Sequence, residues 1–126
     1  MDEPVRVTDR GDGAIEVSLF GDIDFANSAA VRETVLAALT GAALGAVRVD
    51  LAAVTFLDSS GIALLVAAYR LATAKNAGFS VVNPTRSVYE HLRVTGLARL
   101  FGVARPALPA PGTTGGAGRT APPVAS

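Results

Sequence analysis

The pivotal segment of this sequence reads VTFLDSSG, residues 54–61. Residues 47–51, just before it, have the apolar and β-branched composition of a strand, and residues 62–69 have that of a helix. An aspartate and two serines therefore lie where a strand becomes a helix. The first amides of a helix lack intrahelical acceptors and the local dipole is positive, so side-chain oxygens or a phosphate are stabilised there.

The rest of the sequence alternates between strand-like and helix-like patterns. Strands are predicted at residues 5–8, 14–20, 47–51, 79–82 and 100–103. Helices are predicted from Asn27-Ser28 to about residue 39, from about Ser60 to Lys75, and from Asn83-Pro84 to Gly96. The second helix is expected to bury a stripe formed by Ile62, Leu65, Val66, Tyr69 and Ala72. The order β-β-α-β-α-β-α-β predicts an α/β fold, with helices packed on a mixed sheet of four to five strands.

Composition predicts a single domain followed by a tail. Half of the 126 residues are hydrophobic and 17% are charged, which suits one folded core. Residues 106–126 are rich in proline and glycine and poor in large apolar side chains. Such a segment buries too little surface to offset its loss of conformational entropy. We therefore expect a domain at residues 1–105 and a flexible tail at residues 106–126.

Charge and residue counts exclude several classes of function. The formal net charge is zero, whereas nucleic acids and anionic membranes recruit basic proteins. With no cysteine, no disulfide or thiolate chemistry is expected, and a single histidine makes a histidine-based zinc site unexpected. No cofactor is expected. The first residues are acidic without an apolar leader, and no apolar run approaches the ~20 residues that span a bilayer. These features predict a cytoplasmic protein and leave its oligomeric state open between a monomer and a weak dimer.

Three segments resemble one protein family. The most specific, DLAAVTFLDSSG at residues 50–61, is similar to the signature of the STAS domains, the sulfate-transporter and anti-sigma-factor-antagonist family, and is closest to the bacterial anti-sigma factor antagonists. GDID at residues 21–24 is similar to a turn of the family, and VTGL at residues 94–97 to the segment that closes its third helix. The resemblance spans residues 5–103 and implies a STAS fold, in agreement with the pattern of elements.

The resemblance also implies a function. In these antagonists the first hydroxyl residue after the aspartate is phosphorylated by an anti-sigma factor that is also a serine kinase, and here that position is Ser59. The unphosphorylated antagonist binds the kinase, which frees the sigma factor. The phosphorylated antagonist lets go of the kinase, and a metal-dependent serine phosphatase resets the antagonist. The chain is then a substrate of these enzymes and not itself an enzyme. A phosphate adds about −1.5 to −2 charges, which a helix N-terminus tolerates and a contact surface does not.

Asp58, Ser60 and Gly61 are expected to form a partner-binding surface together with Ser59. Asp58 either caps the helix or orients Ser59 and contacts the kinase, and Ser60 is expected mainly as a cap. Gly61 is expected to allow close backbone approach, with a turn conformation as the alternative.

The turn after the second predicted strand is expected on the same surface. Asp22 and Asp24 belong to it, although each is also explained as a residue that ends a strand. Phe25 and Ile62 are candidates for an apolar contact patch, with core packing favoured for both. Ala63 stands where many family members have a second glycine, which puts the packing of the helix near the site in doubt.

Two other functions are weighed against this one. A hydrolase with a catalytic triad needs His91 beside Ser59 or Ser60, but His91 lies between Glu90 and Arg93 in a pattern typical of a solvated helix face. The chain also lacks a Gly-x-Ser-x-Gly elbow and a phosphate-binding glycine loop. The second alternative keeps the fold without the switch, as an unphosphorylated scaffold subunit of a larger lipid-transport or stress-signalling assembly.

Overall fold

The computed structural model describes residues 3–41 and 43–106 of the chain. Its elements are, in chain order, β1 (Val5–Asp9), β2 (Ala14–Ile23), α1 (Ser28–Thr40), β3 (Ala46–Leu57), α2 (Ser59–Ala74), β4 (Gly78–Val82), α3 (Arg86–Val94) and α4 (Leu97–Leu100). The predicted tail lies outside the described residues, apart from Pro106. Within the described ranges, no helix combines the length and the apolar character needed to cross a membrane.

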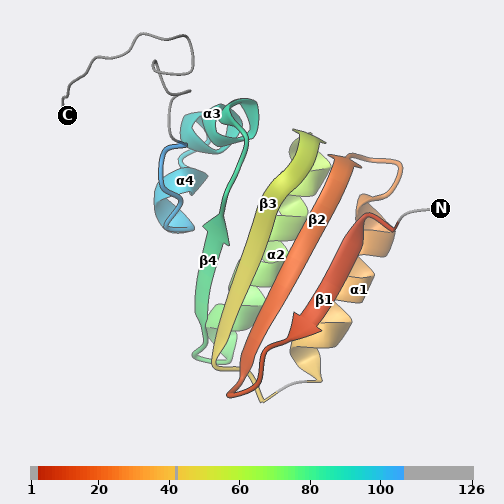
Figure 1. Ribbon diagram of the computed structural model, residues 1–126, viewed down its shortest axis with the longest axis vertical. Coiled ribbons are helices and arrows are strands. Elements are labelled where there is room, and N and C mark those ends of the chain that lie inside the picture. Colours follow the sequence, from red (N-terminus) through yellow and green to blue (C-terminus); the bar gives the residue numbers. More distant parts are fainter. Residues whose placement is uncertain (1–2, 42, 107–126) are drawn as a thin grey trace, which may run out of the picture.

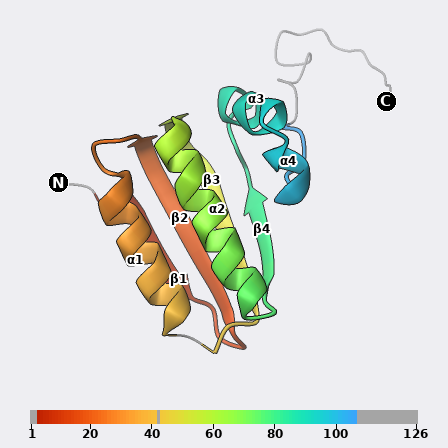
Figure 2. The ribbon, with the colours of Figure 1, turned by 180° about the vertical axis from the view of Figure 1, so that it is seen from behind.

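The strands form one mixed sheet in the order β1-β2-β3-β4. β1 pairs antiparallel with β2, whereas β3 is parallel to both β2 and β4. The parallel strands are connected through α1 and α2, and both helices pack on the same face of the sheet (Figures 1 and 2). α3 and α4 lie beside β4 at one edge (Figure 1). The predicted α/β architecture is confirmed, with four strands in the sheet.

The hydrophobic core fills the space between the sheet and the two long helices. Strands contribute alternate residues to it, and helices contribute residues three or four apart. Its largest fully buried side chains include Val17, Leu19, Ile23, Val31, Val35, Leu39, Val47, Leu51, Leu64 and Leu65. Each such burial stabilises the folded chain by about 1.5–3 kcal/mol, so the core fixes how α1 and α2 lie on the sheet.

The buried face of α2 differs from the predicted stripe. The buried residues of α2 are Gly61, Leu64, Leu65, Ala68 and Ala72. The prediction is confirmed for Leu65 and Ala72, whereas Ile62, Val66 and Tyr69 are only half-buried and pack against the margin of the core. Gly61, near the start of α2, belongs to this buried face at a point where the helix backbone lies close to the sheet. A bulkier residue at that position would hold the helix farther away.

β3 is longer than predicted. The sequence predicts a strand that ends at Leu51, but β3 continues to Leu57. From Leu51 onward, the buried residues of β3 are Leu51, Val54 and Leu57. They are three residues apart, so the period of two is lost. The register with β2 shifts twice, between residues 18 and 20 and between residues 21 and 22 of β2, where β3 has an extra residue each time. Two β-bulges therefore explain why the end of the strand is not visible in the sequence pattern.

The start of α3 also differs from the prediction. Asn83 does not cap the helix, because its φ of +58° is left-handed, a conformation that Asn tolerates better than most residues. Thr85 is the N-cap, with φ −65° and ψ 165°. Its hydroxyl accepts a hydrogen bond from the amide of Val88 at 3.3 Å. Thr85 therefore caps α3, and the helix begins after Asn83 and Pro84, which the sequence predicts as its cap and first residue.

The strand predicted at residues 100–103 does not form. Residues 97–100 are the short helix α4, and a turn follows it. Gly96 has a φ of +80° and ends α3 in the left-handed conformation that the sequence predicts. The chain therefore reverses at this glycine into another helical turn, so β4 remains the edge strand of the described sheet.

An aromatic cluster anchors the segment after α4. Phe101 is fully buried, and its ring centroid lies 5.8 Å from that of Tyr69 and 5.4 Å from that of Phe79. Its carbonyl accepts a hydrogen bond from the amide of Val81 at 3.2 Å. Aromatic packing therefore attaches α4 to β4 and α2 without a fifth strand.

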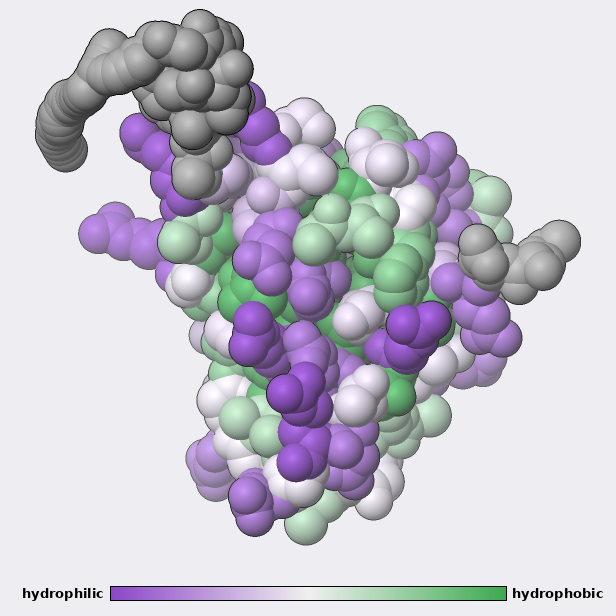
Figure 3. All heavy atoms as spheres, in the orientation of Figure 1, coloured by the Kyte–Doolittle hydropathy of each residue, from purple (hydrophilic) through white to green (hydrophobic). Residues whose placement is uncertain are grey.

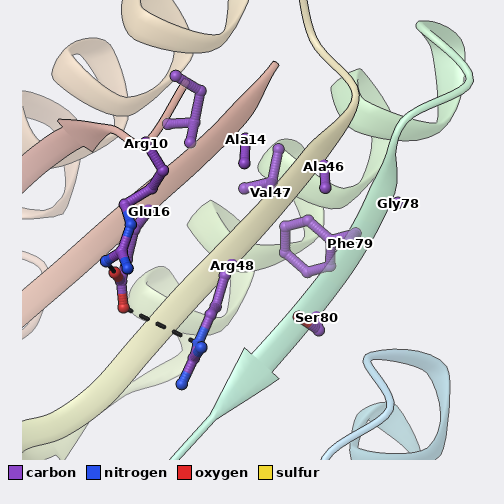
Figure 4. Close-up of a pocket in the computed structure, with 10 residues that line it drawn as sticks. Arg10, Ala14, Glu16, Ala46, Val47, Arg48, Gly78, Phe79 and Ser80 are labelled. Carbon is purple, nitrogen blue, oxygen red and sulfur yellow. Dashed lines mark hydrogen bonds and ion pairs between the residues drawn. The ribbon is translucent and has the colours of Figure 1, made fainter. Parts of the chain in front are cut away.

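The face of the sheet opposite α1 and α2 carries no helix in the part of the chain that the structure describes, and polar side chains are spread over it (Figures 1 and 3). Glu16 pairs there with Arg10 and with Arg48, whose Nε lies 3.8 Å from Glu16 Oε2 (Figure 4). Beside this ion pair lies a hollow of about 480 Å³ over three small residues in register, Ala14, Ala46 and Gly78. The face is a solvated side of an amphipathic sheet.

The C-terminal end of α1 is held by a residue just beyond α2. Lys75 Nζ donates hydrogen bonds to the carbonyl oxygens of Leu39 and Thr40, at 2.9 and 3.0 Å. The last carbonyls of a helix have no intrahelical donor, and the dipole there favours a cation. The two long helices are therefore joined at this end by a polar contact as well as by the core.

Lys75→Met is expected to lower the free energy of unfolding by about 1–2 kcal/mol, because two helix-terminal carbonyls lose a charged donor. Urea unfolding followed by circular dichroism measures the change. Arg99→Met, at an exposed position of α4, is the control and should change the stability by less than about 0.5 kcal/mol. Equal losses in the two variants would show that the contact does not stabilise the fold.

Candidate functional site

The candidate site lies where β2 and β3 end side by side. The two strands are parallel, so the turns that follow them lie at the same end of the sheet, beyond the carboxyl ends of the strands. Residues 22–23 of β2 pair with residues 56–57 of β3. One turn leads into α1 and the other into α2. The topology therefore brings Asp22 and Asp24 to the same end of the molecule as residues 58–61.

Asp58 connects the two turns through both of its carboxylate oxygens. Oδ1 accepts hydrogen bonds from the amides of Ser60 at 2.9 Å and Gly61 at 3.1 Å, which caps α2. Oδ2 accepts from the amide of Phe25, in the other turn, at 3.1 Å. The amide of Asp58 in turn donates to the carbonyl of Ile23 at 3.2 Å. Of the two roles predicted for Asp58, the structure shows the cap, and it adds a link to the turn before α1.

Ser60 supports the same carboxylate. Its hydroxyl donates to Asp58 Oδ1, and its side chain is half-buried. This bond, joined by the amides of Gly61, Ser60 and Phe25, holds the pKa of Asp58 below its ordinary value, although burial acts in the opposite direction. Asp58 is therefore ionised at neutral pH, and Ser60 is engaged in the cap that the sequence predicts.

Ser59 differs from its neighbours because it is exposed. It is the first residue of α2, and within the described residues its hydroxyl makes no hydrogen bond. Phosphorylation of Ser59 stays a prediction. A kinase needs access to the hydroxyl, and the structure provides that access.

Gly61 is buried where α2 comes closest to the sheet. A Cβ atom added to Gly61 would lie 2.5 Å from Leu57 Cδ1 and 3.0 Å from the carbonyl oxygen of Ile23. Real side chains do not fit at such distances without a shift of the backbone or the core. The close backbone approach predicted for Gly61 is therefore confirmed, and it sets the position of α2.

The two aspartates before α1 have different surroundings. Asp22 is exposed, and its Oδ1 accepts a hydrogen bond from the Thr55 hydroxyl at 2.6 Å. The half-buried carboxylate of Asp24 accepts from the amide of Ala26 at 3.0 Å. Asn27 accepts from the amide of Asp24 at 3.0 Å, so its side chain ties this turn together and does not cap α1. Asp24 thus shapes the turn, Asp22 presents its charge at the surface, and contact of either with a partner stays a prediction.

Two exposed phenylalanines flank these polar residues. The core packing favoured for Phe25 is wrong, because its side chain is 86% exposed. Phe56, which the sequence does not single out, is 52% exposed. Ile62 is half-buried. Since the amide of Phe25 is bound by Asp58, the ring of Phe25 projects from a fixed turn. Neither exposure follows from periodicity, because one residue lies in a turn and the other beyond a β-bulge.

His91 is a further residue that the sequence pattern misplaces. It is not on a solvated helix face: it is half-buried, and its Nδ1 lies 2.9 Å from the carbonyl oxygen of Leu57. A carbonyl oxygen only accepts, so Nδ1 is the donor of this hydrogen bond. The Ser60 hydroxyl is bonded to Asp58 and not to the imidazole, which is not a triad geometry. No cluster of three or more metal-ligating side chains occurs among the residues that the structure describes.

Gly61→Ala is expected to lower the free energy of unfolding by about 1–3 kcal/mol, because the added methyl group must displace Leu57 or the backbone at Ile23. Gly78→Ala is the matched control, since a Cβ there would meet nothing closer than 4.0 Å. Urea unfolding of both variants measures the difference. A stability loss shared by the two variants would contradict the steric explanation.

Acid titration is expected to reveal the cap. A carboxylate with a depressed pKa stabilises the fold above its unfolded pKa, and this contribution is lost as the pH falls through the folded value. The unfolded value for Asp58 is near 3.8, so the loss should occur below about pH 4. Asp58→Asn should be less stable at pH 7 and should show a smaller acid-induced loss, measured by urea unfolding between pH 2.5 and 7. An unchanged pH dependence in the variant would exclude this role of Asp58.

Comparisons with known proteins agree with this architecture. A family model described as "Mlab, STAS domain" matches residues 7–103. An anti-sigma factor antagonist from Mycobacterium paratuberculosis is 33% identical, with a TM-score of 0.71 over 82% of this chain and 86% of that chain. An anti-sigma-factor antagonist (STAS) domain protein from Planctomyces limnophilus is 27% identical, with a TM-score of 0.70 over 80% of this chain and 88% of that chain. No curated protein matches the sequence.

The fold is also that of SpoIIAA, an anti-sigma factor antagonist. Its unphosphorylated form has a TM-score of 0.71 over 82% of this chain and 88% of that chain, at 19% identity. The phosphorylated form from Bacillus has a TM-score of 0.65 over 82% of this chain and 91% of that chain, also at 19% identity. The family model covers most of the described residues, and the antagonist at 33% identity spans nearly the same region. The chain therefore belongs to the STAS domain family, to which the anti-sigma factor antagonists belong.

Proposed function

We propose that this chain is an anti-sigma factor antagonist whose binding is switched by phosphorylation of Ser59. In its unphosphorylated form it binds an anti-sigma factor that is also a serine kinase, and the sigma factor is released. Phosphorylation of Ser59 by that kinase ends the binding, and a serine phosphatase restores it. The chain is thus a regulatory substrate of two enzymes.

One observation carries this proposal: Ser59 exposes a free hydroxyl at the first residue of α2, beside a carboxylate whose bonds are internal to the fold. The kinship with anti-sigma factor antagonists supports the role. SpoIIAA, which shares the fold, exists in unphosphorylated and phosphorylated forms. These similarities suit a protein that carries a phosphate without losing its structure.

The position of Ser59 separates folding from binding. A phosphate there adds about −1.5 to −2 charges next to the positive end of the α2 dipole, where anions are stabilised. The same charge lies on a surface that already presents exposed Asp22. A kinase surface complementary to the unmodified site would then meet excess negative charge. A penalty of ~3 kcal/mol lowers affinity by more than a hundredfold, which is sufficient for a switch.

The partner-binding surface includes apolar as well as acidic residues. Asp22, Asp24 and the start of α2 form its polar part, and Phe25 and Phe56 expose aromatic rings beside them. Exposed aromatic side chains on a fixed backbone are typical anchors of protein interfaces. We include Phe25 and Phe56 in the surface for this reason, and we propose residues 1–105 as the unit that acts in the cytoplasm.

The test is phosphorylation by an anti-sigma factor kinase from the genome that encodes this chain. With ATP, mass spectrometry should place one phosphate on Ser59. Calorimetric titration should show that Ser59→Ala binds the kinase as tightly as the unmodified chain, and that Ser59→Asp binds more weakly, by about tenfold or more. Ser87→Asp is the matched control, because Ser87 is an exposed serine in the first turn of α3.

Equal affinities of Ser59→Ala and Ser59→Asp would contradict the charge argument. A kinase that binds the chain without phosphorylating it would instead favour the scaffold alternative, in which the chain is a permanent subunit of an assembly. Phosphate on Ser60 in place of Ser59 would also count against the proposal, since the Ser60 hydroxyl is engaged with Asp58.

A further inference from the structure

α2 has few charges for a helix with a solvent-facing side. Its residues Ser59–Ala74 include one charged side chain, Arg70. The shorter α3, in contrast, carries Arg86, Glu90 and Arg93 within nine residues. A helix on the surface of a globular protein normally turns charged residues to water. The composition of α2 is therefore that of a helix whose outer side is covered.

A groove runs between the outer side of α2 and the neighbouring helix α1, on the face of the molecule that Figure 2 shows. Its volume is about 700 Å³. Its apolar lining comes from Leu36 of α1 and from Ala63, Val66, Ala67 and Leu71 of α2. Alanine side chains are short, so they leave room for the backbone of a docked segment. A groove between two helices with such a lining suits the apolar face of a third helix.

Two arginines also line this groove, Arg32 from α1 and Arg70 from α2. Both are exposed, and neither forms an ion pair or a hydrogen bond with another residue of the described ranges. Glu33, the adjacent carboxylate on α1, lines the outer side of α1 and not this groove. A guanidinium group binds carboxylates through two parallel hydrogen bonds. The groove is therefore complementary to a segment that is apolar on one side and acidic at its flanks.

We propose that the groove between α1 and α2 binds an amphipathic helix of the anti-sigma factor, with its apolar side on Leu36, Ala63 and Val66 and its acidic side chains on Arg32 and Arg70. This proposal rests on the proposed function and specifies the chemistry of its partner. It adds a helix-binding surface to the turns around Ser59.

The groove begins about one helical turn from the proposed phosphorylation site. α1 and α2 both run away from the end of the sheet where the two turns lie (Figure 2). Ala63 is about one helical turn beyond Ser59, and Arg70 is about two turns beyond Ala63. A helix docked along the groove therefore has one end beside the Ser59 hydroxyl. Phosphorylation acts at that end of the contact, where it weakens the binding of the whole helix.

The first test is the affinity of charge-reversal variants for the anti-sigma factor kinase, measured by calorimetric titration. Arg32→Glu and Arg70→Glu are each expected to weaken binding by about tenfold, because acidic side chains of the docked helix then face like charge. Arg99→Glu, at an exposed position of α4 outside the groove, makes the same change in net charge and should alter affinity by less than about threefold.

The second test maps the contact by the amide shifts of the ¹⁵N-labelled chain when the kinase is added. The largest changes within the helices should fall on Leu36, Ala63 and Val66. Arg48 and Ser80, on the opposite face of the sheet, should be unaffected (Figure 4). Concentration-dependent shifts at the groove without the kinase would identify a second copy of the chain as the occupant and would overturn the proposal.

The variants separate this proposal from the proposed function. Weak binding of Ser59→Asp together with full binding of the groove variants would overturn the helix-docking site and leave the switch in place. Weak binding of the groove variants with full binding of Ser59→Asp would support the docking site and overturn the switch. Absence of kinase binding by the unmodified chain would overturn both.

Discussion

A single carboxylate holds the candidate site of this molecule together. Asp58 receives the first amides of α2 on one oxygen and the turn before α1 on the other, while its own amide is bound to the end of β2. Two turns that are 33 residues apart in the sequence are thereby fixed relative to each other. Both oxygens of this carboxylate accept hydrogen bonds within the fold, whereas the exposed hydroxyl of Ser59 remains available to a partner.

Under the proposed function, these separate roles of Asp58 and Ser59 would let the site keep its structure while the charge at Ser59 changes. The buried Gly61 brings α2 close to the sheet, and the Asp58 cap fixes the start of the helix, so the contacts that hold the backbone around Ser59 do not involve its hydroxyl. Negative charge at that position lies at the favourable end of the helix dipole. The proposed modification is therefore expected to cost the fold little stability and to act mainly on the binding of a partner.

Most of the fold is predictable from the sequence because the helices and the strands β1, β2 and β4 keep their regular periods. The end of β3 is not predictable, because its bulges replace the period of two by buried residues three apart. The exposure of Phe56 therefore does not follow from the sequence pattern. In the candidate site, the residue types of segment 58–61 predict only the start of a helix, and the resemblance to the STAS signature marks the segment as a site. The positions of Phe25 and His91 are not predictable. The amide of Phe25 is bound to Asp58, and the imidazole of His91 is bound to the carbonyl of Leu57, and local sequence encodes neither contact.

The contact at the opposite end of the helices has a chemical consequence. Lys75 is the sole lysine of the chain, and its ammonium group is engaged by the last carbonyls of α1. An amine in such a contact is a poor nucleophile, because it must first leave its acceptors and lose a proton. Acylation of this lysine, whether enzymatic or by a laboratory reagent, therefore reports how often its amine leaves the carbonyls of Leu39 and Thr40. Once acylated, the nitrogen has lost its charge and cannot form the original pair of charged hydrogen bonds to the end of α1.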